Sequence, residues 1–297
     1  MSFVEKRKKK FGDRKDGHLI KDLPMVNKLL VNLYPNRCDN EVSSTFDLDI
    51  TILTKYINKR KKEDPNCEIK FFHCFIAALV RVINDKRKLL RFVQNHKTYE
   101  KDEIRVSFIA KRAFSEKAEE AVINYFAKKE DNVDSITRFI INEVKGARDE
   151  NQVKQKEKDG KSVESLNKLP NFLFRLLAWF LRKTDKHGKT PKSAMKEDPS
   201  FATVLLSNLG SIGFKSVYHH LNNYGTCSFM ITIGQIVSKV TKGKNGKNET
   251  RTYVDVTAIF DERIADGFYF INAMKLMQEY LNHPETLEKT FDEEVKF

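Results

Sequence analysis

Charged residues and a glycine crowd a seven-residue stretch near the C-terminus, where an apolar strand pattern ends. The stretch reads DERIADG and contains Asp261, Glu262, Arg263, Asp266 and Gly267. A carboxylate such as that of Glu262 becomes an effective base only where the protein keeps water away from it. Arg263 is near enough in sequence to pair with Asp261 or Asp266. The residue types alone leave open whether Glu262 takes part in chemistry or is simply solvated.

A second polar segment follows another predicted strand. It reads SNLGSIG and includes Ser207, Asn208 and Gly210. Backbone N–H groups and a serine hydroxyl at the end of a strand can stabilise a developing negative charge. The same residue types also favour ordinary turns. A little further on, His219 and His220 are candidates for a base, although paired histidines after a strand are often exposed and without function.

Hydrophobic periodicity predicts the elements that must position these residues. The predicted strands are 42–50, 104–110, 201–206, 229–236 and 252–260, and the predicted helices are 25–34, 52–62, 69–84, 116–128, 134–147, 169–181 and 268–280. Thr51 is a plausible cap for the second helix. The turn KGKNGKN at 242–248 predicts an antiparallel hairpin. The pattern is that of a mixed α and β protein.

The charge of the chain favours anionic partners. Its 297 residues include 54 Lys and Arg against 41 Asp and Glu, a formal net charge of +13. Basic residues cluster at 6–10, 59–62 and 239–247, which is typical of solvated tails and hairpin tips as well as of anion-binding surfaces. The sign of the net charge alone does not show whether the partner is nucleic acid, an anionic membrane or a phosphorylated small molecule.

Cysteine usage and hydropathy favour the cytoplasm. The four cysteines are scattered, without a C-x-x-C pair or zinc-finger spacing, so we expect reduced thiols and no metal site. The N-terminus lacks the apolar stretch of a signal peptide, and no apolar run approaches the roughly 20 residues that span a bilayer.

The expected domain organisation is simple. Residues 1–22 are predicted to form a basic N-terminal arm and residues 23–297 a single domain, with 151–200 as an insertion made of a loop and an aromatic helix. The core of that helix, Phe172 to Leu181, is rich in Phe, Leu and Trp and has basic flanks. Such a helix either lies on a membrane surface or covers an apolar surface of the same chain or of a neighbouring subunit.

The two polar turns resemble those of one family. The acyltransferase cores of 2-oxoacid dehydrogenase complexes carry D-H-R-x-x-D-G after a late strand, which Asp261, Arg263, Asp266 and Gly267 match. Chloramphenicol acetyltransferase carries the related H-x-x-x-D-G. The segment TVLLSNLG at 203–210 is similar to a strand end of the dehydrogenase cores. The segment FDLDIT at 46–51, followed by 71–84, looks like the start of both proteins, so the resemblance covers roughly residues 22–284.

This resemblance implies a chloramphenicol acetyltransferase-like, coenzyme A-dependent acyltransferase fold, with a mixed sheet flanked by helices. It further implies a homotrimer with active sites at subunit interfaces. By the same resemblance, Asp266 holds the site in shape through an ion pair, and Ser207 bonds the oxyanion. The roles implied for the remaining matched residues are substrate binding or structural support: Asp261, Arg263, Gly267, Asn208 and Gly210.

Glu262 stands where the family has its catalytic histidine. Relative to an imidazole with a pKa near 6.5, a carboxylate with a pKa near 4.3 is the poorer proton acceptor by about 3 kcal/mol, or roughly a hundredfold in rate. Three hypotheses follow. Glu262 is a substitute base; or His219 or His220 supplies the base; or the protein is a catalytically silent acyl-CoA-binding or assembly protein.

Missing sequence features narrow the expected substrates. The chain carries no lipoyl domain and no swinging linker rich in proline and alanine, so we expect a free acyl-CoA as donor and a thiol or hydroxyl as acceptor. The phosphates of coenzyme A also account for the positive charge. Nucleic acid is therefore not needed as a partner, and we expect neither a lipoyl group nor a metal.

Overall fold

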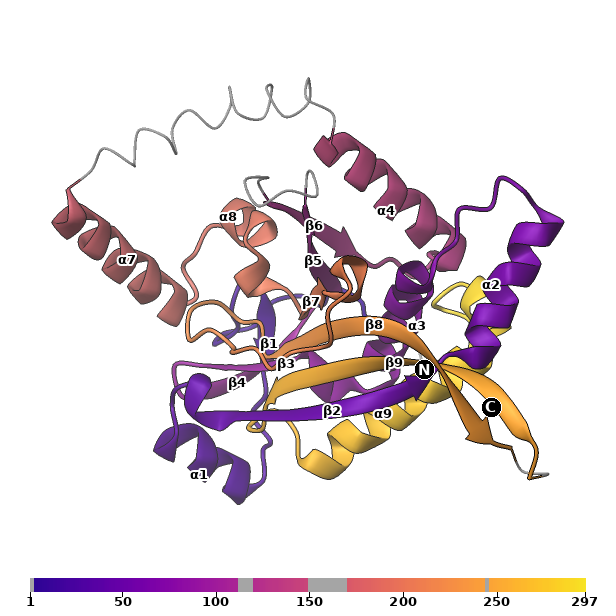
Figure 1. The fold of residues 1–297 in the computed structure, drawn as a ribbon. Helices are drawn as coiled ribbons and strands as arrows, with labels where there is room; N and C mark the ends of the chain where they lie inside the picture. Colours follow the sequence, from indigo (N-terminus) through magenta and orange to yellow (C-terminus); the bar gives the residue numbers. More distant parts are fainter. Residues whose placement is uncertain (1–2, 112–119, 149–169, 244–245) are drawn as a thin grey trace.

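A mixed six-stranded sheet runs through the centre of the molecule (Figure 1). The computed structural model describes residues 3–111, 120–148, 170–243 and 246–297. The strand order is β2-β9-β8-β7-β5-β6. The strands are β2 (Glu41–Asp49), β5 (Arg105–Lys111), β6 (Glu120–Phe126), β7 (Val204–Asn208), β8 (Phe229–Lys242) and β9 (Asn248–Asp261). Strand β7 is parallel to β5 and β8, and the other neighbours are antiparallel.

One face of this sheet packs on helices. Successive side chains of a strand point to opposite faces, and Val254, Val256, Ala258 and Phe260 of β9 belong to the main hydrophobic core together with residues of α3 and α9. The helices that contribute to this core include α2 (Thr51–Glu63), α3 (Phe71–Asp85), α4 (Val133–Arg148) and α9 (Gly267–Asn282). Helix α3 is buried along most of its length, as its nearly continuous apolar sequence predicts.

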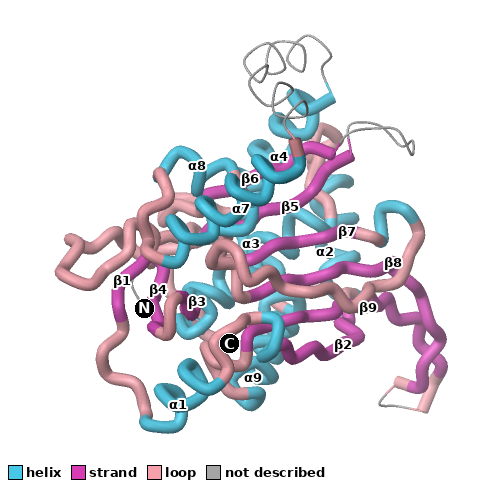
Figure 2. Tube along the Cα trace, turned by 90° about the vertical axis from the view of Figure 1, so that its left-hand side faces the viewer, coloured by secondary structure: helices cyan, strands magenta, loops and turns pink. Residues whose placement is uncertain are grey.

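The opposite face of β2, β8 and β9 is largely polar. The segment between β7 and β8 crosses it, since Ser216 bonds through its backbone N–H to Asp255 at 2.5 Å and through its hydroxyl to Thr257 at 2.8 Å. A second, three-stranded antiparallel sheet lies beside the first, in the order β1-β4-β3 (Figure 2). Its strands are β1 (Gly17–Leu19), β3 (Arg91–Gln94) and β4 (Lys97–Lys101).

Residues 3–19, expected as a basic arm, lie on the body of the protein. Phe3 is buried and its ring stacks on Phe291 at 5.9 Å, and Arg14 is buried in an ion pair with Asp185 at 3.0 Å. Strand β1 pairs with β4. Three further helices lie at the periphery: α1 (Met25–Leu33), α7 (Asn171–Lys186) and α8 (Lys192–Glu197).

Two local predictions are wrong. The segment 116–128 was expected to be helical, yet Glu120–Phe126 is strand β6, because pairing with β5 buries Ile123 and Tyr125 on one side. Thr51 does not cap α2; Asp49 accepts a hydrogen bond from the backbone N–H of Thr51 at 2.9 Å. The expected hairpin of β8 and β9 is confirmed. The predicted loop 151–164 lies outside the described residues.

Candidate active site

Asp261 and Arg263 form a buried ion pair at the end of β9. The guanidinium of Arg263 donates through Nε to Oδ1 of Asp261 at 2.8 Å and through Nη2 to Oδ2 at 2.6 Å. Its Nη1 donates to the carbonyl oxygens of Tyr34 and Pro35 at 2.9 and 2.8 Å. Paired charge-assisted bonds of this kind are the strong form of the contact, so they tie the turn after β9 to the segment after α1.

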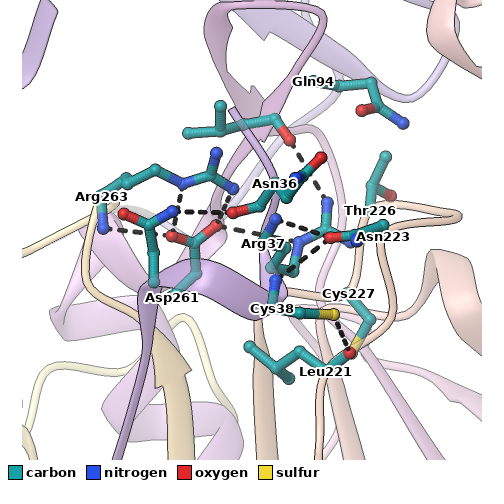
Figure 3. Close-up of polar contacts among 12 residues, drawn as sticks. Asn36, Arg37, Cys38, Gln94, Leu221, Asn223, Thr226, Cys227, Asp261 and Arg263 are labelled. Atoms are coloured by element: carbon teal, nitrogen blue, oxygen red, sulfur yellow. Dashed lines mark hydrogen bonds and ion pairs between the residues drawn. The ribbon is translucent and has the colours of Figure 1, made fainter. Parts of the chain in front are cut away.

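A second arginine, Arg37, completes this buried cluster (Figure 3). Its Nε lies 3.8 Å from Oδ2 of Asp261, and its Nη2 donates to the carbonyls of Val93 at 3.3 Å and Gly225 at 3.0 Å. The side chain of Asn223 accepts from the backbone N–H of Arg37 at 2.7 Å. Burial lowers the pKa of Arg37, and the charge of Asp261 opposes that shift. One carboxylate is thus shared by two buried guanidinium groups.

Glu262 lies between two buried residues but is itself exposed. Its backbone N–H donates to the carbonyl of Asn40 at 3.0 Å, which fixes the main chain at this point. Its carboxylate makes no hydrogen bond or ion pair with any residue in the described part of the chain. Arg263 cannot neutralise it, because that guanidinium already bonds Asp261 and two carbonyls. The Glu262 carboxylate is therefore unpaired among the described residues, while its backbone is held in place by the bond to Asn40.

Exposed apolar side chains surround this end of the sheet. Leu33 and Tyr34, at the end of α1, are 68% and 51% exposed, and Phe268, at the start of α9, is 75% exposed. Clustered exposed apolar side chains are typical of surfaces that contact another molecule. A partner that covers them also removes water from the neighbourhood of Glu262.

Asp266 lies at the exposed start of α9. It caps α9 by accepting from the backbone N–H of Tyr269 at 2.9 Å, and among the described residues its ion-pair contact is with Lys88 at 3.9 Å. The buried ion pair that holds this turn belongs to Asp261 instead. A Cβ at Gly267 would meet no atom within 4 Å in one chain, so packing within the chain does not require glycine there.

Ser207 belongs to a row of hydroxyl side chains across the polar face of the sheet. Its Cα pairs with that of Thr232, and Thr232 in turn pairs with Thr257. Thr232 donates to the carbonyl of Val217 at 2.6 Å, so the crossing segment holds it. The half-buried hydroxyl of Ser207 makes no hydrogen bond with another described residue. It is free to donate to a ligand.

The turn after Ser207 is held tightly. Asn208 accepts from the backbone N–H of Ser211 at 3.3 Å and, through its carbonyl, from the Ser211 hydroxyl at 2.8 Å. A Cβ at Gly210 would lie 2.1 Å from the carbonyl oxygen of Gly234, beside the irregularity in β8. Gly210 is therefore required for packing, and the amide of Asn208 supports the turn.

Ser207 and Glu262 do not meet within one chain. They are two strands apart, and Glu262 lies five residues beyond Thr257, the residue of β9 in register with Ser207. With about 3.3 Å per residue and about 4.8 Å between strands, their separation is roughly 20 Å. One chain therefore supplies two half-sites, one at each end of the central strands.

His219 and His220 lie at the Glu262 end of the polar face. The following residue, Leu221, donates its backbone N–H to Glu41 at 2.5 Å, and Glu41 pairs with Asp261. Both histidines are exposed. Nδ1 of His219 lies 2.9 Å from the backbone nitrogen of His220, and as an acceptor there it leaves the proton on Nε2. His220 is accordingly the better placed of the two to accept a proton.

Sequence reasoning missed Arg37, Asn40 and Glu41. They lie more than 200 positions before Glu262, and a single arginine beside Pro35 and Asn36 has no spacing that distinguishes it from a surface loop. Across the described residues, no group of three or more metal-ligating side chains is found. No helix in the described part of the chain is long and apolar enough to cross a membrane.

Comparison with known proteins confirms the fold. Residues 181–288 match the family model of the 2-oxoacid dehydrogenases acyltransferase (catalytic domain). No curated protein matches the chain significantly. The structure is similar to a probable dihydrolipoamide acetyltransferase from Listeria monocytogenes 4b F2365, with a TM-score of 0.57 and 16% identity over 91% of this chain and 96% of that chain.

Two further structures show the same architecture. The dihydrolipoamide acetyltransferase of Azotobacter vinelandii has a TM-score of 0.52 and 11% identity over 91% of this chain and 94% of that chain. Chloramphenicol acetyltransferase has a TM-score of 0.50 and 13% identity over 89% and 99%. The chain therefore has the fold of the chloramphenicol acetyltransferase-like acyltransferases, and its residues 181–288 match the model of the 2-oxoacid dehydrogenases acyltransferase catalytic domain.

Proposed function

We propose that the protein transfers an acyl group from an acyl-coenzyme A to a thiol or hydroxyl acceptor. The observation that carries this proposal is the buried Asp261–Arg263 pair, which presents Glu262 at the histidine position of the family motif as an unpaired carboxylate. A turn whose chemistry had been lost would be free to pair Glu262 with the adjacent guanidinium. Here that guanidinium bonds Asp261 and the carbonyls of Tyr34 and Pro35 instead.

The site requires two copies of the chain. Ser207 and Glu262 are roughly 20 Å apart within one copy, too far to act on the same carbonyl group. Glu262 of one copy and Ser207 of a neighbouring copy can face each other across an interface, and the exposed Leu33, Tyr34 and Phe268 beside Glu262 favour such a contact. A closed cyclic homotrimer provides three equivalent sites of this kind.

Glu262 and Ser207 have separate roles in the proposed reaction. Glu262 takes the proton of the acceptor as its sulfur or oxygen attacks the thioester carbonyl carbon, and the carbonyl electron pair moves to oxygen. Ser207 of the neighbouring copy donates a hydrogen bond to that oxyanion. When the intermediate collapses, the carbon–sulfur bond of the donor breaks and the coenzyme A thiolate takes the proton back from Glu262.

A basic cavity offers a place for the phosphates of coenzyme A. It has a volume of about 200 Å³ and lies at the end of the sheet where β5 and β7 begin, the same end as Glu262. Lys15, Lys192 and Lys196 are among its lining residues. We expect K192Q/K196Q to raise the KM for acyl-CoA with little change in kcat, since phosphate contacts made equally in the ground and transition states affect binding alone.

Free-thiol release from a panel of acyl-CoA donors and acceptors tests the proposal. Glu262→Gln is expected to lower kcat by about a hundredfold or more, and Ser207→Ala by about the same factor. His220→Ala leaves the rate unchanged if Glu262 is the base. If His220→Ala removes activity and Glu262→Gln does not, the base is His220. If the protein binds coenzyme A but turns over none of the donors, it is a catalytically silent binding protein.

Complementation tests the shared site. Glu262→Gln and Ser207→Ala chains, each inactive alone, are co-expressed so that mixed oligomers form. At equal expression about a quarter of the interfaces combine an intact Glu262 with an intact Ser207, and that share of activity should return. Mixed oligomers that stay inactive contradict an interface site, as does a protein that is active as a monomer.

A further inference from the structure

Helix α7 exposes an unusual amount of apolar surface. Six of its large apolar side chains are between 36% and 66% exposed: Phe172, Phe174, Leu176, Trp179, Phe180 and Leu181. Asp185 is the one residue of this fully described helix that is buried. Among the described residues, the helix therefore does not cover an apolar surface of its own chain, whereas the expected contacts with a membrane or a neighbouring subunit are not tested by a single chain. Its apolar part, residues 171–180, also lies outside the residues that match the family model.

The helix is attached at its C-terminal end. The buried carboxylate of Asp185 accepts from Arg14 at 3.0 Å, from Gln94 at 2.5 Å and from the backbone N–H of Gly225 at 3.0 Å. Figure 1 shows the remainder of α7 at the edge of the molecule, beside and apart from the central sheet. The C-terminal end of α7 is thus fixed to the body of the protein, and the apolar part extends away from it.

The exposed charges on α7 are all positive. They are Arg175, Arg182, Lys183 and Lys186, whereas the single acid of the helix, Asp185, is buried and paired. Arg175, Arg182 and Lys186 recur at intervals of seven and four residues and so form one narrow stripe. The ammonium of Lys183 lies 4.6 Å from the centre of the Trp179 ring. A broad apolar face with a basic border is the composition of helices that lie in a membrane interface.

We propose that α7 binds the surface of an anionic lipid bilayer, with its apolar face among the acyl chains and its basic stripe at the headgroups. Charge complementarity favours this occupant over a second α7. A second copy that docked α7 against α7 would bring eight like charges together, because a two-fold contact places the same patch on both sides. Anionic lipids meet the same cations with opposite charge. The helix lies on the bilayer and does not span it.

Trp179 is the only tryptophan of the chain and reports on this helix directly. The full-length protein is mixed with vesicles of phosphatidylcholine and phosphatidylglycerol, or of phosphatidylcholine alone. We expect flotation with the anionic vesicles, a blue shift of the tryptophan emission and quenching by brominated acyl chains. The neutral vesicles should bind much more weakly, and added salt should weaken binding to the anionic ones.

Variants separate the two contributions. Arg175→Gln/Arg182→Gln should weaken binding by about fivefold per residue, and Phe172→Ser/Phe180→Ser by about tenfold per residue. Val240→Ser is the control, because Val240 is 69% exposed and lies near the turn between β8 and β9, away from α7 and its anchor. These side chains are all exposed, so unfolding curves should not change.

Three outcomes overturn the proposal. One is an unshifted Trp179 emission and no flotation with anionic vesicles at low salt. Another is a shift that depends on protein concentration without lipid, which would assign the helix to a second copy. A blue shift in inorganic phosphate alone would likewise show an ion effect and not bilayer binding. Acyl-transfer activity enters none of these readouts, so this proposal stands or fails independently of the proposed function.

Discussion

Removing the charge of Asp261 should destabilise the protein severely. In the wild type this carboxylate accepts two side-chain bonds from Arg263, at 2.8 and 2.6 Å, and lies 3.8 Å from Nε of Arg37. Asp261→Asn keeps one acceptor oxygen but leaves two guanidinium groups buried without a counter-ion. Breaking a buried pair in this way costs about 3–5 kcal/mol, a large part of a typical total of about 5–15 kcal/mol.

Urea unfolding at neutral pH measures this loss. Asp266→Asn is the matched control, because Asp266 is exposed and asparagine is an equally good N-cap, so that variant should lose less than about 0.5 kcal/mol. A double-mutant cycle with Arg263→Met should show strong coupling, since removing both members leaves fewer unpaired charges than removing Asp261 alone. A loss below about 1 kcal/mol for Asp261→Asn would refute the reasoning, because that is the range of an exposed ion pair.

Three further predictions follow from other parts of the molecule. Burial and two nearby lysines lower the pKa of His73 to about 4, so the unfolded chain binds the proton first and stability should fall by about 3 kcal/mol as the pH drops from about 6.5 to about 4; His73→Leu should remove that dependence in unfolding curves across this range. Gly210→Ala should cost about 1–3 kcal/mol in thermal unfolding because its Cβ would strike the carbonyl of Gly234, whereas Gly267→Ala, with open space around it, should be nearly neutral. Glu262→His should raise the acyl-transfer rate by up to about a hundredfold, since an imidazole is the better acceptor by about 3 kcal/mol; a histidine variant no faster than Glu262→Gln would argue against proton transfer at this position.

Hydrophobic periodicity predicted the helices and strands whose apolar residues follow one clear period. The apolar run of α3 was placed within two residues at either end. The alternation in β8 and β9 identified both strands but predicted them too short at the hairpin, by six and four residues. Strand β6 was mistaken for a helix because its sequence fits both periods, and only pairing with β5 decides between them. The small sheet was missed because its strands, such as β1 with three residues, are too short to show a period.

The candidate site was predictable where its residues are close in sequence. Asp261, Arg263, Asp266 and Gly267 could be grouped from their spacing, but which carboxylate pairs with Arg263 depends on burial. Asp261 is the partner because the end of β9 lies in the interior, whereas Asp266 lies at the exposed start of α9. The contribution of Arg37 comes from a segment more than 200 residues away, and no local pattern reveals a contact of that range.

The strength of Glu262 as a base depends on what covers it. Within one chain the carboxylate is exposed, and water keeps a carboxylate weakly basic. The adjacent guanidinium does not pair with it, because Arg263 bonds Asp261 and two backbone carbonyls instead. A neighbouring copy that covers Leu33, Tyr34 and Phe268 would remove water from Glu262 and bring Ser207 to it in the same step. Assembly would then create the base and the oxyanion donor together, and a separated chain would have neither.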